Sequence, residues 1–122
     1  MQATKPFHSV NNIPSGATLT VTASNISGNV QADAHFMPGA EPVDEVDWTL
    51  QQMEAGTAQT PLPGPGISIA RVRVAMAQGS QARFDMVIKH NGTQIRRKFW
   101  ELAADSNTTA RIGLVIDVVG GQ

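Results

Sequence analysis

Basic side chains that could bind a polyanion are concentrated in one stretch of the chain. Seven of the nine Lys and Arg residues lie between Arg71 and Trp100. In a β-strand successive side chains point to opposite faces, so Val72 and Val74 would share one face while Arg71 and Arg73 share the other. A sheet that carries a row of cations on one face suggests a polyanion partner, and RNA is the first candidate.

Two further segments show the same separation of apolar and charged side chains. In the first, Phe84 and Ile88 point one way, while Arg83 and Lys89 point the other, together with an acidic and an apolar residue. In the segment that follows, 94–98, two cations line up on one side. Three such strands in a meander would place their apolar side chains on a core and their cations on the opposite face.

The charge is distributed unevenly along the chain. Before Arg71 there is one basic residue against six acidic ones, and from Arg71 onward there are eight basic residues against four acidic ones. Two alternatives to polyanion binding also fit this asymmetry. The charges could simply coat the solvent side of an antiparallel sheet, or the acidic part of one subunit could meet the basic part of another in head-to-tail association.

Length and composition bound the possible functions. A chain of 122 residues fits a single domain, 1–122, and the absence of cysteine excludes disulfides, thiol nucleophiles and cysteine-based zinc sites. We find neither a signal peptide nor a membrane-spanning apolar run. The three histidines match no metal-ligand spacing, the acidic run 41–47 is expected to be a solvated face, and no catalytic motif is present. We therefore expect no enzyme activity, no small-molecule substrate, no metal and no cofactor.

The rest of the chain is expected to be mostly β-structure. Alternation predicts an N-terminal hairpin with strands near 17–24 and 30–36, followed by a strand at 46–50. The proline-rich segment 56–66 is expected to be an extended connection. Asn91 and Gly92 form the strongest hairpin signal in the chain.

The last segment fits two structures. Ile112, Leu114, Ile116 and Val118 alternate as in a strand, whereas Ile112, Val115, Ile116 and Val119 recur at helical spacing. The β-branched content and a glycine at position 113 favour a strand. A capping residue at 106 or 107 and two glycines at 120–121 would suit a helix.

The basic segment resembles the central strands of coat proteins from single-stranded RNA bacteriophages, the leviviruses. In these proteins a strand of the form Arg-Val-x-Val-small-apolar-x-Gln leads through a short polar turn into an aromatic-led strand that ends in a basic residue. The matching residues here are Arg71, Val72, Val74, Ala75, Met76 and Gln78, then Gly79 and Ser80, then 84–89. The proline-bearing lead-in at 61–66 is similar as well, and the family's capped helix after the last strand favours a helix in the tail.

The resemblance implies a fold and a function. The fold is α+β, with an N-terminal hairpin, an antiparallel meander sheet and a C-terminal helix that packs across a homodimer; an all-β sandwich is the alternative. The function is that of a structural coat protein, assembled in the bacterial cytoplasm into an icosahedral virion around genomic RNA. The RNA-binding residues implied are Arg71, Arg73, Arg83, Lys89, Gln94, Arg96 and Lys98. The residues expected at the dimer or oligomer interface are Trp100, Ile112, Val115, Ile116 and Val119.

Two adjacent aromatic residues keep a second function open. Phe99 and Trp100 would point to opposite faces of a strand, so one of them is expected to leave the core. An exposed aromatic residue more often fills an oligomer interface, but it is also how a sugar ring is bound by stacking. The alternative function is therefore a lectin-like β-sandwich that binds carbohydrate. This alternative requires a seventh strand in the tail, polar loops gathered at one end and no affinity for RNA.

Overall fold

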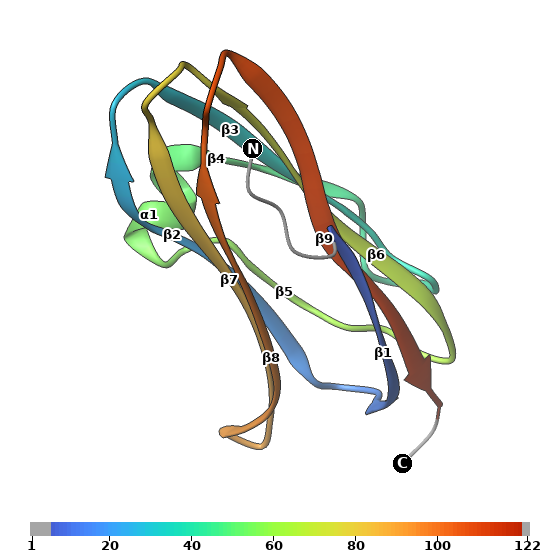
Figure 1. Ribbon diagram of the computed structural model, residues 1–122. Helices are drawn as coiled ribbons and strands as arrows, with labels where there is room; N and C mark the ends of the chain where they lie inside the picture. The colour runs from blue at the N-terminus through green and yellow to red at the C-terminus, as the bar shows by residue number, and fades with distance from the viewer. Residues whose placement is uncertain (1–5, 121–122) are drawn as a thin grey trace.

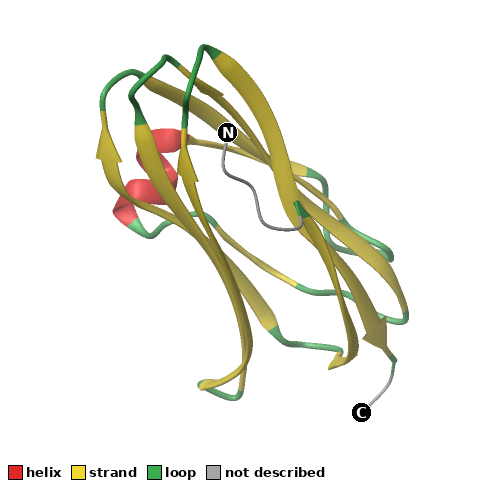
Figure 2. Ribbon diagram, in the orientation of Figure 1, coloured by secondary structure: helices red, strands yellow, loops and turns green. Residues whose placement is uncertain are grey.

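The computed structural model describes residues 6–120, which fold into two β-sheets packed face to face (Figure 1). Most of the described chain is strand, as Figure 2 shows, with one short helix at one side of the sandwich. Sheet A contains, in order across the sheet, β1 (Phe7–Pro14), β9 (Thr108–Val119), β6 (Gly66–Met76), β3 (Val30–Met37) and β4 (Val46–Thr49). Sheet B contains β5 (Gln59–Pro61), β2 (Thr18–Ser27), β7 (Gln81–His90) and β8 (Thr93–Ala103).

The chain passes repeatedly from one sheet to the other. The connections from β2 to β3, from β6 to β7 and from β8 to β9 each link a strand of sheet B with a strand of sheet A. β1 pairs with β9 in parallel, whereas the other strand pairs are antiparallel. The first and last strands are therefore neighbours at one side of sheet A.

The core lies between the inner faces of the two sheets. On each central strand the apolar side chains alternate with polar ones, so that every second residue is buried, as Val72 and Val74 are on β6. Sheet B contributes Phe84 and Trp100, which are both buried. The alternation expected for these strands is confirmed. It fixes which face of each strand enters the core, because a shift of one residue would expose the whole apolar set.

The helix α1 (Leu50–Ala55) follows β4 directly and fills the side of the sandwich next to β2 and β3. Thr49 caps its first turn, with its hydroxyl accepting from the Gln52 amide while the Gln52 side chain accepts from the Thr49 amide. Gly56 ends the helix with φ 79°, a left-handed conformation that glycine adopts without strain. Met53 anchors α1 in the core.

The expected α+β fold with a C-terminal helix is wrong, and the all-β alternative fits. The tail is strand β9, which pairs with β6 from Thr108 to Val118 and with β1 along its other edge. Gly113 suits this central position, because a Cβ atom there would lie 2.1 Å from the Ala70 carbonyl oxygen. The segment therefore forms the strand that its β-branched composition favours, not the helix that its spacing allows. It is stabilised as a strand because it pairs with another strand along both edges.

The expected strand pairings are also partly wrong. β7 and β8 form the predicted hairpin, with Asn91 at φ 54° and Gly92 at φ 78° in its turn. β6 pairs instead with β3 and β9, so the three basic segments do not form one meander. The N-terminal hairpin is absent as well, since β2 pairs with β5 and β7. A turn signal shows where the chain reverses, but not whether it stays in the same sheet.

Within residues 6–120, the structure has no helix with the length and apolar character required to cross a bilayer.

Candidate functional site

The sandwich distributes the expected RNA-binding cations over two opposite faces. Arg71 and Arg73 lie on β6 and point outward from sheet A. Arg83 and Lys89 lie on β7 and point outward from sheet B. Because packed sheets turn their outer faces away from each other, these two pairs cannot contact one flat surface.

The other residues expected to bind RNA lie on β8, at an open side of the sandwich. On edge strand β8, Arg96 and Lys98 pair with the buried residues Ile88 and Met86, so both cations stand on the inward-facing side of the strand. The Arg96 guanidinium reaches across to the other sheet and donates to the main-chain oxygen of Asn11 at 3.2 Å. Gln94 pairs with the exposed Lys89 rather than with a buried residue, and it lies near the end of the hairpin.

The outer face of sheet B carries a closed cluster around Asp85. Arg83 donates to this carboxylate at 2.9 Å and Arg97 donates to it at 2.9 Å. Both guanidinium groups also lie over the ring of Phe99, at 4.3 Å and 5.5 Å from its centroid. Phe99 is therefore the member of the aromatic pair that leaves the core, but its ring is already in contact with two charged groups of the protein.

Electrostatics reinforce this cluster. Partial burial alone would raise the pKa of Asp85, but hydrogen bonds from Arg83 and Arg97 outweigh it and hold the pKa of the carboxyl below its usual value. The Asp85 hydrogen bond is also the main reason that the pKa of Arg83 is raised. The charges of the cluster are thus largely compensated within the protein, which leaves Arg83 poorly suited to bind a polyanion.

The residues expected at an oligomer interface are divided between the core and the surface. Trp100 is 1% exposed and its ring lies 5.9 Å from that of His8, so it belongs to the core of the single chain. Ile112 and Ile116 are buried on the inner face of β9. Val115 and Val119 point outward from sheet A, where Val119 is 37% exposed.

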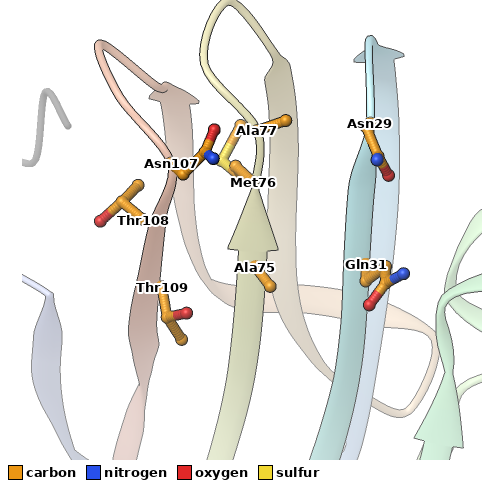
Figure 3. A pocket seen from close by; sticks show the side chains of 8 residues that line it. All are labelled: Asn29, Gln31, Ala75, Met76, Ala77, Asn107, Thr108 and Thr109. Atoms are coloured by element: carbon orange, nitrogen blue, oxygen red, sulfur yellow. The ribbon is translucent and has the colours of Figure 1, made fainter.

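A polar groove lies at the end of sheet A where three inter-sheet connections meet (Figure 3). Its volume is about 530 Å³. Gln31, Ala75 and Thr109 form one row across β3, β6 and β9, because Gln31 pairs with Ala75 and Ala75 with Thr109. The small Ala75 leaves a depression between the amide on one side and the hydroxyl on the other. The groove is lined by Asn29, Gln31, Ala75, Met76, Ala77, Asn107, Thr108 and Thr109.

Hydrogen bonds between the connections hold the end of this groove in place. The buried hydroxyl of Ser80 donates to the Asn29 main-chain oxygen at 3.1 Å and accepts from the Asn29 amide at 2.9 Å. The Asn107 side-chain oxygen accepts from the Gln78 amide at 2.9 Å. Ala104 and Ser80 are joined as well, through a main-chain bond of 3.0 Å. Polar groups that are fixed in this way lose little freedom when a ligand binds.

The groove continues along the strands toward the middle of sheet A. A second hollow of about 250 Å³ shares Gln31 and Ala75 with the first and adds Ala32, Asp33 and Arg73. Asp33 and Arg73 lie directly opposite each other in the pairing of β3 with β6. The extended groove thus presents amide and hydroxyl groups at one end and a pair of opposite charges at the other.

This arrangement is suited to recognition by hydrogen bonds. Each amide and each hydroxyl offers both a donor and an acceptor, and those of Gln31 and Thr109 stand on the strands on either side of Ala75. Elsewhere in the described residues, His35 contacts Glu45 at 3.1 Å and Asp47 at 2.5 Å. Among residues 6–120, no three acidic or histidine side chains are grouped so that they could hold a metal ion.

No family model, no curated protein and no solved structure matches this chain. The geometry of the groove and of its surroundings therefore carries the functional assignment.

Sequence reasoning missed the groove residues. Gln31 and Thr109 are isolated polar residues on separate strands, 78 positions apart in the chain, and no local motif joins them. Asn107 is a candidate helix cap in the sequence, whereas in the structure it lies just before β9 and bonds to the β6–β7 connection. The one available signal is that polar residues lie at or beside three turns, at 29–31, 78–80 and 107–109.

Proposed function

We propose that this chain is a lectin-like β-sandwich module that binds a neutral carbohydrate in the groove formed by Gln31, Ala75 and Thr109. The observation that carries the proposal is the row of these three residues, in which a small side chain separates an amide from a hydroxyl. Sugar hydroxyls both donate and accept hydrogen bonds, so they match groups with the same double capacity. A volume of about 530 Å³ is ordinary for a ligand site.

The shape of the groove favours a short linear glycan over a single ring. The second hollow extends the first along the strands and ends at Asp33 and Arg73. Charged groups make stronger hydrogen bonds to hydroxyls than neutral groups do. A second sugar unit in this second hollow would reach Asp33 and Arg73. These two residues would then add to the affinity and fix the direction of the glycan.

The fold also supports this proposal over the coat-protein function. The lectin-like alternative requires a strand in the tail and polar connections gathered at one end, and both features are present. The coat function requires a helix across a dimer and cations gathered on one face. The tail forms β9, and the cations lie on two opposite faces and at an edge. Sugar stacking on Phe99 is not part of the proposal, because Arg83 and Arg97 already lie over that ring.

A glycan array followed by calorimetry tests the proposal. We expect the chain to bind one class of neutral glycan, and Ala75→Leu to abolish binding because the larger side chain fills the depression. Ala103→Leu is the matched control, since Ala103 is a half-buried alanine on sheet B. Binding that survives Ala75→Leu, or an array without a bound glycan, would contradict the proposal. Round particles that hold nuclease-protected RNA would restore the coat function instead.

A further inference from the structure

The end of sheet A away from the groove carries an exposed apolar patch on its outer face. Ile67 is 51% exposed, Met37 40% and Val119 37%. Ile69 and Val115 lie half-buried beside them. Met37, Ile69 and Val115 form one row across β3, β6 and β9. Apolar side chains gathered in this way on a folded surface mark an interaction site.

Two charged residues flank this row on opposite sides. Arg71 lies two positions beyond Ile69 on β6, on the side of the groove. Asp117 lies two positions beyond Val115 on β9, on the other side. Neither of them takes part in an ion pair within residues 6–120. The row of Met37, Ile69 and Val115 therefore has a cation on one side and, level with Ile67, an anion on the other.

We propose that two copies of this chain associate through this patch as a two-fold symmetric dimer. In a symmetric dimer the same surface is used twice, so the surface must be complementary to itself. A two-fold axis that runs along the row of Met37, Ile69 and Val115 reverses the strand direction of the second copy. Arg71 of each copy then faces Asp117 of the other copy, and the apolar rows of the two copies pack together.

The charge arrangement is the reason to choose a second copy as the occupant. An unrelated partner would need only an apolar surface. Here a cation and an anion lie on either side of an apolar row, so a second copy that is turned around this row brings its anion to the cation of the first copy. A two-fold axis along the strands would instead bring the two copies of Arg71 to the same side of the contact, which like-charge repulsion disfavours. The row of Gln31, Ala75 and Thr109 lies farther along the same face, six residues along β6 from the row of the contact (Ala75 against Ile69).

Light scattering coupled to size exclusion, over a dilution series of the full chain, tests the dimer. We expect a dimer that dissociates on dilution. Met37→Glu is expected to give a monomer, because Met37 lies in the row on the axis and the two copies of the new charge would face each other. Phe99→Glu is the matched control: it makes the same kind of change at a residue that is 47% exposed on the opposite face, and the dimer should persist.

Charge reversal tests the orientation of the two copies. Arg71→Asp and Asp117→Arg should each weaken the dimer by at least about fivefold, because each removes two exposed ion pairs and creates two like-charge contacts. The double variant Arg71→Asp with Asp117→Arg should restore the dimer, since both pairs form again with their signs exchanged. Restoration would not occur if the single changes acted only by disturbing the fold.

Three results would overturn the proposal. They are a monomer at every concentration, a dimer that Met37→Glu leaves intact, and a double variant that dissociates as readily as the single ones. If Met37→Glu does not fold, as judged by its circular dichroism, Met37→Gln provides the same test with a smaller change. All of these measurements are made without sugar, so their outcome is independent of whether the groove binds a glycan.

Discussion

Ser80 and Asn29 are 51 positions apart in the chain, yet the Ser80 hydroxyl both donates to and accepts from the main chain of Asn29. Ser80 is 1% exposed, so water cannot replace either bond. A short polar side chain thus joins the β2–β3 connection to the β6–β7 connection, directly behind the groove. Gly28 makes this approach possible, because a Cβ atom there would lie 2.5 Å from the Ser80 hydroxyl oxygen.

The first prediction concerns this link. Ser80→Ala removes both hydrogen bonds between the buried Ser80 hydroxyl and the Asn29 main chain, and we expect the free energy of unfolding to fall by about 1–3 kcal/mol. Urea denaturation measures the change. Ser24→Ala on the exposed face of sheet B is the control and should alter stability little. Equal losses for the two variants would show that the link between the connections contributes nothing.

The second prediction concerns hydrogen bonding in the groove. Gln31→Ala and Thr109→Val should each weaken glycan binding, since a hydrogen bond contributes about 0.5–1.5 kcal/mol. Titration calorimetry with the glycan selected on the array gives the affinities. Gln59→Ala and Thr20→Val make the same changes on sheet B and should leave the affinity unchanged. A glycan whose affinity responds to neither groove variant must bind elsewhere.

The third prediction concerns the pH dependence of stability. Because the folded-state pKa of Asp85 lies below its usual value, this group stabilises the fold fully above its unfolded-state pKa of about 3.9. The stabilisation is lost as the pH falls through the lower folded-state value. Denaturation of Asp85→Asn should therefore show a smaller loss of stability between neutral and acidic pH than the parent protein does. A stability curve for Asp85→Asn that coincides with the curve of the parent protein would refute the role of Asp85.

The fourth prediction separates the two adjacent aromatic residues. Trp100→Ala should cost about 3–5 kcal/mol of stability, as is usual for a large buried aromatic residue. Phe99→Ala should cost much less, because nearly half of its surface is already exposed and its ring lies under two arginine side chains on the outer face rather than in the core. Thermal unfolding of the two variants under the same conditions gives the comparison. Similar losses would mean that Phe99 carries far more packing than its exposure indicates.

The strands and their buried faces could be predicted from the sequence, and so could one hairpin. Val72 and Val74 alternate with arginines, and Phe84 and Ile88 alternate with charged residues, which fixes the side of each strand that enters the core. Asn91 and Gly92 specify their turn through positive φ angles that few other residues adopt without strain. These features depend on residues that are close together in the sequence, so they can be recognised without knowing the fold.

The pairing of the strands and the groove could not be predicted in the same way. Gly79 and Ser80 signal a turn, but the choice between a hairpin and a passage to the other sheet depends on which distant strand offers a free edge. The tail has two periodicities, and pairing with β1 and β6 decides between them. Gln31 and Thr109 meet only because β6 lies between their strands, with an alanine in the shared row.

The parallel pairing of β1 with β9 determines how the domain responds to mechanical force (Figure 1). Phe7 pairs with Gly113 and Pro14 with Val119, so the start of the first strand and the end of the last strand lie at opposite ends of the pair. Tension applied to the two ends of the chain pulls these strands past each other lengthwise. The hydrogen bonds between them then bear the load together, whereas in an antiparallel pair at the termini they would open one after another.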